Sequence, residues 1–69
     1  MRLSARNIIK GKILEVKRGA TTAHVRIDVS GGTVIASSIT NEAVDELGLK
    51  AGDLAYAVIK ASDVTVARD

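Results

Sequence analysis

Eight consecutive residues in the second quarter of the chain alternate strictly between polar and apolar side chains. The apolar members are Ala23, Val25, Ile27 and Val29. A period of two puts successive side chains on opposite faces of an extended backbone, so this run predicts a β-strand over 22–29 with one face in a core. Gly31 and Gly32 follow. Because glycine tolerates the positive φ of tight turns, they predict a hairpin into a next strand.

The other segments predict further strands joined by turns without proline. These strands are expected over 7–17, 33–39, 54–60 and 64–67. Gly11 interrupts the first of them and indicates a bulge or bend, as at a barrel corner.

One helix of about two turns is expected between the third and fourth strands. Thr40 or Asn41 can cap its start, and Gly48 stands where a left-handed residue commonly ends a helix. The order β-β-β-α-β-β in a single domain over 1–69 is that of an all-β protein. It is typical of a small five-stranded OB-type barrel with one short helix between strands three and four.

A domain of 69 residues buries only about 60% of its unfolded surface, so its stability is marginal without further support. There is no cysteine, which excludes disulfides and thiolate metal sites, and the lone His24 cannot hold a transition metal by itself. Hydrophobic residues make up 46% of the chain, more than one small core requires. Oligomerisation is therefore the expected source of stability.

The expected compartment is the cytoplasm. No run approaches the roughly 20 apolar residues of a membrane helix. Residues 1–12 carry charges throughout and lack the apolar centre of a secretory signal.

The residue types that catalysis requires are not grouped along the chain. His24 falls in the middle of a predicted strand, with no cysteine available for a Cys–His pair. Asp45 and Glu46 are adjacent, but neighbours on a helix do not face each other. No glycine-rich phosphate-binding motif occurs. The sequence therefore predicts a binding protein and no enzyme.

Positive charge is concentrated in the first third of the chain. Residues 1–26 contain seven Lys or Arg against one acid, whereas residues 27–69 contain three against seven. A basic segment favours an anionic partner. A small nucleic-acid-binding or regulatory module is one alternative, but such modules stack bases on aromatic rings. The one aromatic residue, Tyr56, falls in the apolar fourth strand, so nucleic acid ranks below a small anion. A purely structural oligomerisation domain is the other alternative.

Hydrogen-bond donors suited to an anion occur at three ends of the predicted elements. Residues 4–7 offer a hydroxyl, a guanidinium, an amide and successive N–H groups before the first strand. Residues 37–40 place hydroxyls just before the helix, where exposed N–H groups favour an anion. Residues 60–62 add an ammonium, N–H groups and a hydroxyl at a strand end.

The chain resembles the molbindin (Mop) family over essentially its whole length. The resemblance lies in the stretches SARNIIKGKILEVKRGATTAHVRI, GGTVIASSIT, EAVDELGLKAGD and AYAVIKASDVTVA. The SARN start with the following KG and the VIKASDV end are its most specific parts. Members of this family are small cytoplasmic molybdate-binding proteins, and their stand-alone forms are hexamers built as trimers of dimers. The resemblance implies a homo-oligomer, expected to be a hexamer, with molybdate or tungstate as bound ligand and no organic cofactor.

The resemblance also implies an oxyanion site between subunits, in which no side chain ligates a metal directly. Carried over position by position, its donors would come from Ser4, Ala5, Arg6, Asn7, Thr40, Lys60, Ala61 and Ser62. Some of these would belong to a neighbouring chain. Some members have Ser directly after the Lys, where this chain has Ala61, and Ser62 or a backbone N–H would then take over that donor.

A site made only of donors suits a tetrahedral dianion that carries no proton. Molybdate has four acceptor oxygens and is fully deprotonated at neutral pH. Phosphate keeps a proton that would find no acceptor, at a cost of about 1–3 kcal/mol. Only cavity size can reject sulfate, and molybdate and tungstate are too alike to be separated at this level. The expected function is oxyanion binding for intracellular storage or homeostasis.

Overall fold

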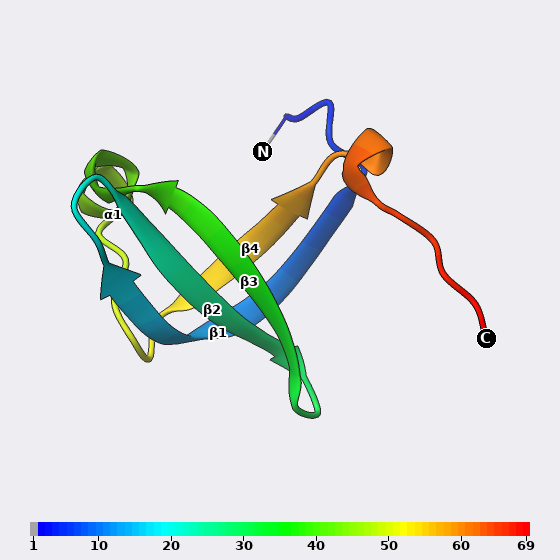
Figure 1. The fold of residues 1–69 in the computed structure, drawn as a ribbon, viewed down its shortest axis with the longest axis horizontal. Helices are drawn as coiled ribbons and strands as arrows, with labels where there is room; N and C mark the ends of the chain where they lie inside the picture. Colours follow the sequence, from blue (N-terminus) through cyan, green and yellow to red (C-terminus); the bar gives the residue numbers. More distant parts are fainter. Residues whose placement is uncertain (1) are drawn as a thin grey trace.

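A computed structural model describes residues 2–69, and its order of elements follows the predicted one up to the fourth strand. The elements are β1 (Asn7–Arg18), β2 (Thr22–Ser30), β3 (Thr33–Thr40), α1 (Asn41–Leu47), β4 (Leu54–Ile59) and the 3₁₀ helix η1 (Ala61–Asp63). The strands form one antiparallel sheet in the order β3-β2-β1-β4. Figure 1 shows this sheet as strongly curved, with α1 near one end and η1 near the other.

The inner face of the curved sheet and one side of α1 enclose a small core. The alternation that predicted β2 is confirmed, because Ala23, Val25 and Ile27 are buried and the residues between them are not. The buried residues are Ile13, Ala23, Val25, Ile27, Val44 and Ala57. No helix in residues 2–69 has the length and apolar character needed to cross a membrane.

The sequence predicted a bulge or a bend at Gly11. The bulge is wrong, because β1 and its pairing with β4 run through Gly11 without interruption. The register of β1 against β2 shifts instead between Ile13 and Glu15. Gly11 is buried, and glycine is needed here because β2 lies very close to it. A Cβ at this position would lie 2.5 Å from Cγ2 of Ile27 and 2.7 Å from the main-chain oxygen of Asp28. The missing side chain therefore lets β2 approach β1 closely.

Both predicted ends of the helix are confirmed. Thr40 is the N-cap residue, and its hydroxyl accepts a hydrogen bond from the N–H of Ala43 at 3.0 Å. Gly48 ends the helix with φ of 62°, in the left-handed region, and its N–H bonds back to Asp45 and Val44. Such a cap satisfies main-chain groups that the last helical turn leaves free.

The expected fifth strand and closed barrel are both corrected by the structure. Residues 61–63 form η1, and residues 64–69 have no regular secondary structure and are exposed. Within residues 2–69, β3 and β4 are the two edges of the sheet and do not pair with each other. The alternation in 64–67 has the period of a strand, but a strand also needs a partner, and Figure 1 shows this tail (red) running away from the sheet.

Candidate functional site

Two of the three predicted donor groups meet where β1 begins and β4 ends. Asn7 pairs with Ile59 in antiparallel register, and Nδ2 of Asn7 donates a hydrogen bond to the main-chain oxygen of Ile59 at 3.2 Å. Residues 4–6 lead directly into Asn7, and Lys60 directly follows Ile59. The stretches 4–7 and 60–62 therefore leave the sheet at the same end, where Figure 1 draws the N-terminal segment and η1.

The charged groups at this end of the sheet are accessible and unpaired. Arg6 and Lys60 are exposed, as are the hydroxyl-bearing residues Ser4 and Ser62. Among residues 2–69, the ion pair found within 4.0 Å joins Arg18 and Asp45 elsewhere. The guanidinium of Arg6 and the ammonium of Lys60 are thus not neutralised by a contact within the described chain, and both can face an anion.

The backbone of η1 adds donors at the same place. Lys60 is extended, with φ of −64° and ψ of 142°, and the chain then turns. The N–H of Asp63 donates to Lys60 at 2.9 Å and that of Val64 to Ala61 at 3.3 Å. Within the described chain, the N–H groups of Ala61 and Ser62 donate to no other backbone group. They can therefore contribute to binding an oxyanion.

Asp63 is a neighbour that the sequence analysis did not consider. It lies in the only turn of η1, three residues after Lys60, and is exposed. A carboxylate here opposes an anion unless its side chain points away or donors from another chain outweigh it.

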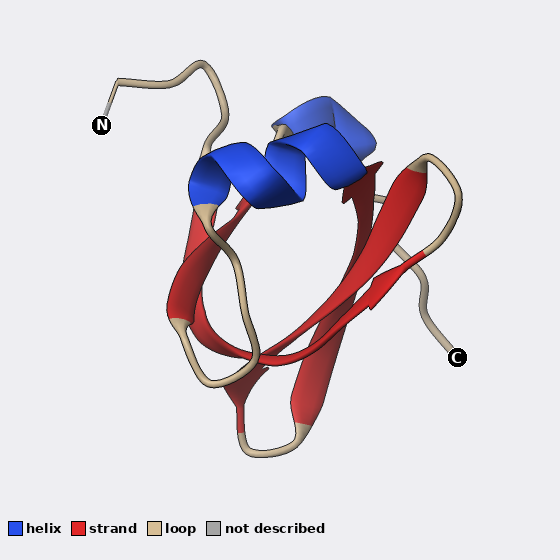
Figure 2. Ribbon diagram, turned by 90° about the vertical axis from the view of Figure 1, so that its left-hand side faces the viewer, coloured by secondary structure: helices blue, strands red, loops and turns tan. Residues whose placement is uncertain are grey.

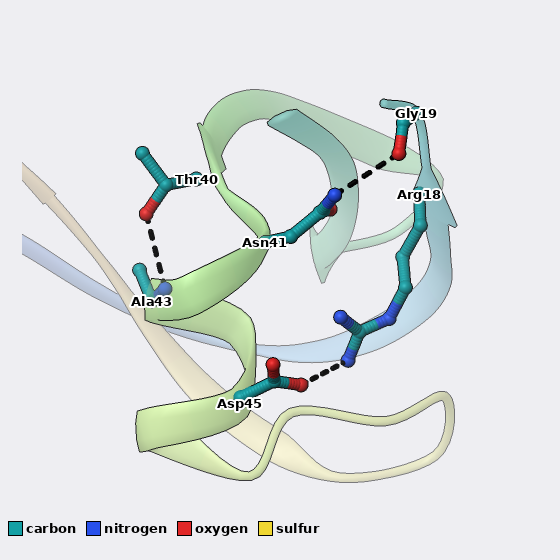
Figure 3. Close-up of polar contacts among 6 residues, drawn as sticks. All are labelled: Arg18, Gly19, Thr40, Asn41, Ala43 and Asp45. Atoms are coloured by element: carbon teal, nitrogen blue, oxygen red, sulfur yellow. Dashed lines mark hydrogen bonds and ion pairs between the residues drawn. The ribbon is translucent and has the colours of Figure 1, made fainter. Parts of the chain in front are cut away.

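Thr40, the last residue of β3, lies near the end of β1 that is opposite to Asn7. It pairs with Thr22, close to where Ala23 pairs with Arg18 at the end of that strand, whereas Asn7 stands at its beginning. One chain therefore does not bring Thr40 together with the other predicted site residues. Figure 3 shows that its hydroxyl oxygen accepts a hydrogen bond from the N–H of Ala43. The hydroxyl proton is then free to donate to another group.

The start of α1 is fixed by contacts that the sequence did not reveal. Asn41 donates from its Nδ2 to the oxygen of Gly19 at 3.0 Å and from its backbone N–H to Thr21 at 2.9 Å. Nη2 of Arg18 lies 2.7 Å from Oδ1 of Asp45 (Figure 3). These contacts hold the N-terminus of α1, and Thr40 with it, against the turn between β1 and β2.

An apolar groove between the two edge strands is a second feature that sequence reasoning missed. It has a volume of about 720 Å³ and is lined by residues of β2, β3 and β4 together with Leu47 and Leu49. Figure 2 shows how the four strands curve around, with the helices at the top of this view. The sequence predicted strands over 33–39 and 54–60. Whether the edges of these strands meet depends on sheet curvature, which no local pattern encodes.

The described residues offer no centre for a protein-bound metal ion. No group of three or more His, Cys, Asp or Glu side chains in residues 2–69 is arranged to hold one. The donors at the end of the sheet are instead hydroxyl, N–H, ammonium and guanidinium groups, which bind the oxygens of an anion.

Comparison with known proteins covers nearly the whole chain. Residues 3–66 match the TOBE domain family. Molybdenum-pterin-binding protein 1 of Clostridium pasteurianum is 46% identical over 66 residues, which make up 96% of this chain and 97% of that protein.

Two solved structures share the fold. A molybdate-binding protein from Sporomusa ovata superposes with a TM-score of 0.93 at 31% identity, over 99% of this chain and 100% of that one. The cytoplasmic molybdate-binding protein ModG, with molybdate bound, gives a TM-score of 0.84 at 54% identity, over 88% of this chain but 43% of its own. The predicted family is thus confirmed: the chain belongs to the TOBE domain family and, within it, to the molybdenum-pterin-binding (Mop) proteins.

Proposed function

We propose that this protein binds molybdate, or the closely similar tungstate, at a site shared between copies of the chain. It would serve intracellular storage or homeostasis of molybdenum or tungsten in the cytoplasm, without catalysing a reaction. The observation that carries the proposal is the meeting of residues 4–7 and 60–62 at one end of the sheet, through the Asn7–Ile59 pairing. The molybdate-bound relative ModG, described as cytoplasmic, supports the choice of ligand and compartment.

Each donor at this end has a distinct task in the proposed site. Arg6 and Lys60 supply the two positive charges that balance a dianion, and charge-assisted hydrogen bonds are roughly twice as strong as neutral ones. Ser4 and Ser62 supply hydroxyls, and the N–H groups of the first turn of η1 supply fixed dipoles. Apart from the neighbouring Asp63, these groups can all donate to the anion. Such a set favours an oxyanion that carries no proton, which discriminates against phosphate.

The position of Thr40 supports a site that is shared between chains. Its hydroxyl has a free proton but lies at the far end of β1 from Asn7 within the same chain. For Thr40 to reach the same anion as Lys60, it must come from a second copy. Two chains packed end to end would also bring the N-terminus of α1 toward the anion, and so offset the carboxylate of Asp63 with further positive potential.

The groove between β3 and β4 supports assembly independently of the anion. Both edges have unpaired main-chain groups, and the groove between them is apolar. Exposed edges of this kind are normally covered. The tail over 64–69 is exposed, begins in an extended conformation at Val64 and alternates as Val-Thr-Val. A tail from a neighbouring copy would fill the groove with apolar side chains and pair with the main-chain groups of the edges. This is consistent with the proposed hexamer.

Native mass spectrometry of the purified protein with and without molybdate tests the proposal. We expect a hexamer whose mass increases by that of bound oxyanion. Because a ligand at 100 times its Kd stabilises by about 2.7 kcal/mol, we also expect the melting temperature to rise by on the order of 10 °C. Arg6→Ala and Lys60→Ala should remove most of this rise.

Lys50→Ala is the matched control, since Lys50 is an exposed lysine in the turn between α1 and β4, away from the site. It should keep the full rise in melting temperature. A monomer that takes up neither molybdate nor tungstate would refute the proposal, and so would equal stabilisation of the wild type and both site variants.

A further inference from the structure

The outer face of the sheet carries cations that the proposed oxyanion site does not use. Gly11 and Ile13 are buried, so Lys10 and Lys12 of β1 point outward. Beyond the register shift Val16 packs toward the core, which turns Lys17 outward. On β2, Arg26 lies between two buried residues and is exposed. We name Lys10, Lys12, Lys17 and Arg26 the basic face.

Tyr56, the one residue of the chain that is Phe, Tyr or Trp, stands beside this basic face. The sequence placed Tyr56 in an apolar strand, but its neighbours Ala55 and Ala57 are the residues that pack against the core. Tyr56 therefore points away from the core, and 52% of its surface is exposed, although part of it also lines the apolar groove beside β4. It is paired with Lys10 across β1 and β4, so the two Cβ atoms are about 5 Å apart. His24 is likewise exposed and is paired with Lys17.

Two carboxylates share the outer face and neutralise part of it. Glu15 is paired with Arg26, and Asp28 with Lys12. Neither forms an ion pair within 4.0 Å in the described chain. Lys10 is instead paired with Tyr56, and Lys17 with His24. The face carries four cations and two acids, so its net charge is positive. Its two unopposed lysines each stand next to a group that can stack on a base.

From this arrangement we propose that the outer face of β1, β2 and β4 binds single-stranded nucleic acid, with its phosphates on the basic face and a base stacked on Tyr56. Single-strand binding combines a basic track along the backbone with aromatic stacking, and it tolerates many sequences because every base has a flat face. Side chains two residues apart on β1 lie about 6.6 Å apart along the strand. Lys10 and Lys12 can thus contact successive phosphates beside the stacked base.

Fluorescence anisotropy of a labelled oligothymidine of about 16 nucleotides, titrated with the purified protein, tests the proposal. We expect binding at about 50 mM salt that weakens as salt increases, with a log–log slope of about −2 for three phosphate contacts. Lys10→Gln should reduce that slope by about 0.7. Tyr56→Leu keeps an apolar side chain without the ring, and should weaken binding about tenfold at an unchanged slope. Tyr56→Phe should bind as the wild type does.

Controls separate this face from the oxyanion site and from general charge attraction. Lys50→Gln removes the same charge elsewhere and should leave binding intact. The basic-face variants should still bind molybdate as the wild type does. No binding at about 50 mM salt would overturn the proposal. Equal losses from Lys10→Gln and Lys50→Gln would also overturn it. An unchanged Tyr56→Leu, or an equal affinity for inorganic polyphosphate, would mean general polyanion attraction instead and would overturn it as well.

Discussion

The side chain of Asn7 is hydrogen-bonded to the main-chain oxygen of Ile59, 52 positions away in the sequence, at 3.2 Å. The same two residues end the ladder between β1 and β4. This contact is half-buried and stands between the N-terminal donors and Lys60. It brings together two stretches that are far apart in the sequence and that form one half of the proposed oxyanion site.

Asn7→Ala should therefore affect both stability and oxyanion affinity. Removing one partner of such a bond costs about 0.5–1.5 kcal/mol, which in a domain of this size lowers the melting temperature by roughly 4–8 °C per kcal/mol. Urea unfolding measures the first effect and calorimetric titration with molybdate the second. Asn7→Asp, of equal size but without the donor, should be at least as harmful. A variant with wild-type stability and affinity would show that the contact does not hold the site together.

Close approach of two strands makes Gly11 the least replaceable glycine. The Cβ of Gly11→Ala would fall 2.5 Å from Cγ2 of Ile27 and 2.7 Å from the oxygen of Asp28, which is backbone and cannot rotate away. Overpacking of this kind costs about 1–3 kcal/mol. At Gly31 nothing lies within 4 Å and φ is +52°, so Gly31→Asn should be nearly neutral because asparagine tolerates this region. If chemical denaturation gives both variants the same midpoint, the close approach of β2 to Gly11 does not restrict which residue can stand there.

Local chemistry made much of the fold predictable. Alternation over 22–29 predicted β2, and the two glycines predicted the turn after it. Thr40 and Gly48 predicted the two ends of α1, because helix caps depend on residues only a few positions apart. The Arg18–Asp45 ion pair and the Asn7–Ile59 bond could not be read in the same way, because they join residues 27 and 52 positions apart.

The prediction of a fifth strand was wrong because a strand, like those long-range contacts, depends on a distant partner. Residues 64–67 have the right period, but no strand edge of the same chain lies beside them. For the proposed site, the donors over 4–7 and 60–62 were predicted from residue type. Their meeting, and the distance of Thr40 from them, follow from strand register, which one sequence does not specify.

Thr40 has one observed role and one proposed role, and a single substitution can separate them. Its hydroxyl oxygen caps α1 by accepting from Ala43, and its proton is proposed to reach an oxyanion held by a neighbouring chain. Thr40→Asp keeps a capping oxygen but brings a negative charge. We expect a melting temperature near that of the wild type and a loss of molybdate binding in titration calorimetry. Thr40→Ser should preserve both properties, whereas Thr40→Ala should lose about 1 kcal/mol of stability. Full molybdate binding by Thr40→Asp would remove Thr40 from the site.

The exposed tail offers a test of how the chains assemble. Val66 is 87% exposed in one chain, although an apolar groove lies open between β3 and β4. If the tail of a neighbouring copy adds a strand there, Val64 and Val66 point into the groove and Thr65 points away, because side chains alternate along a strand.

Val66→Asp would then place an unpaired carboxylate against apolar residues, which costs several kcal/mol, so light scattering should report smaller particles than for the wild type. Thr65→Asp adds the same charge one position earlier and should leave the particle mass unchanged. The two variants differ only in which face of the tail is altered, and so an equal effect of both on the mass, or no effect of either, would rule out an added strand in the groove.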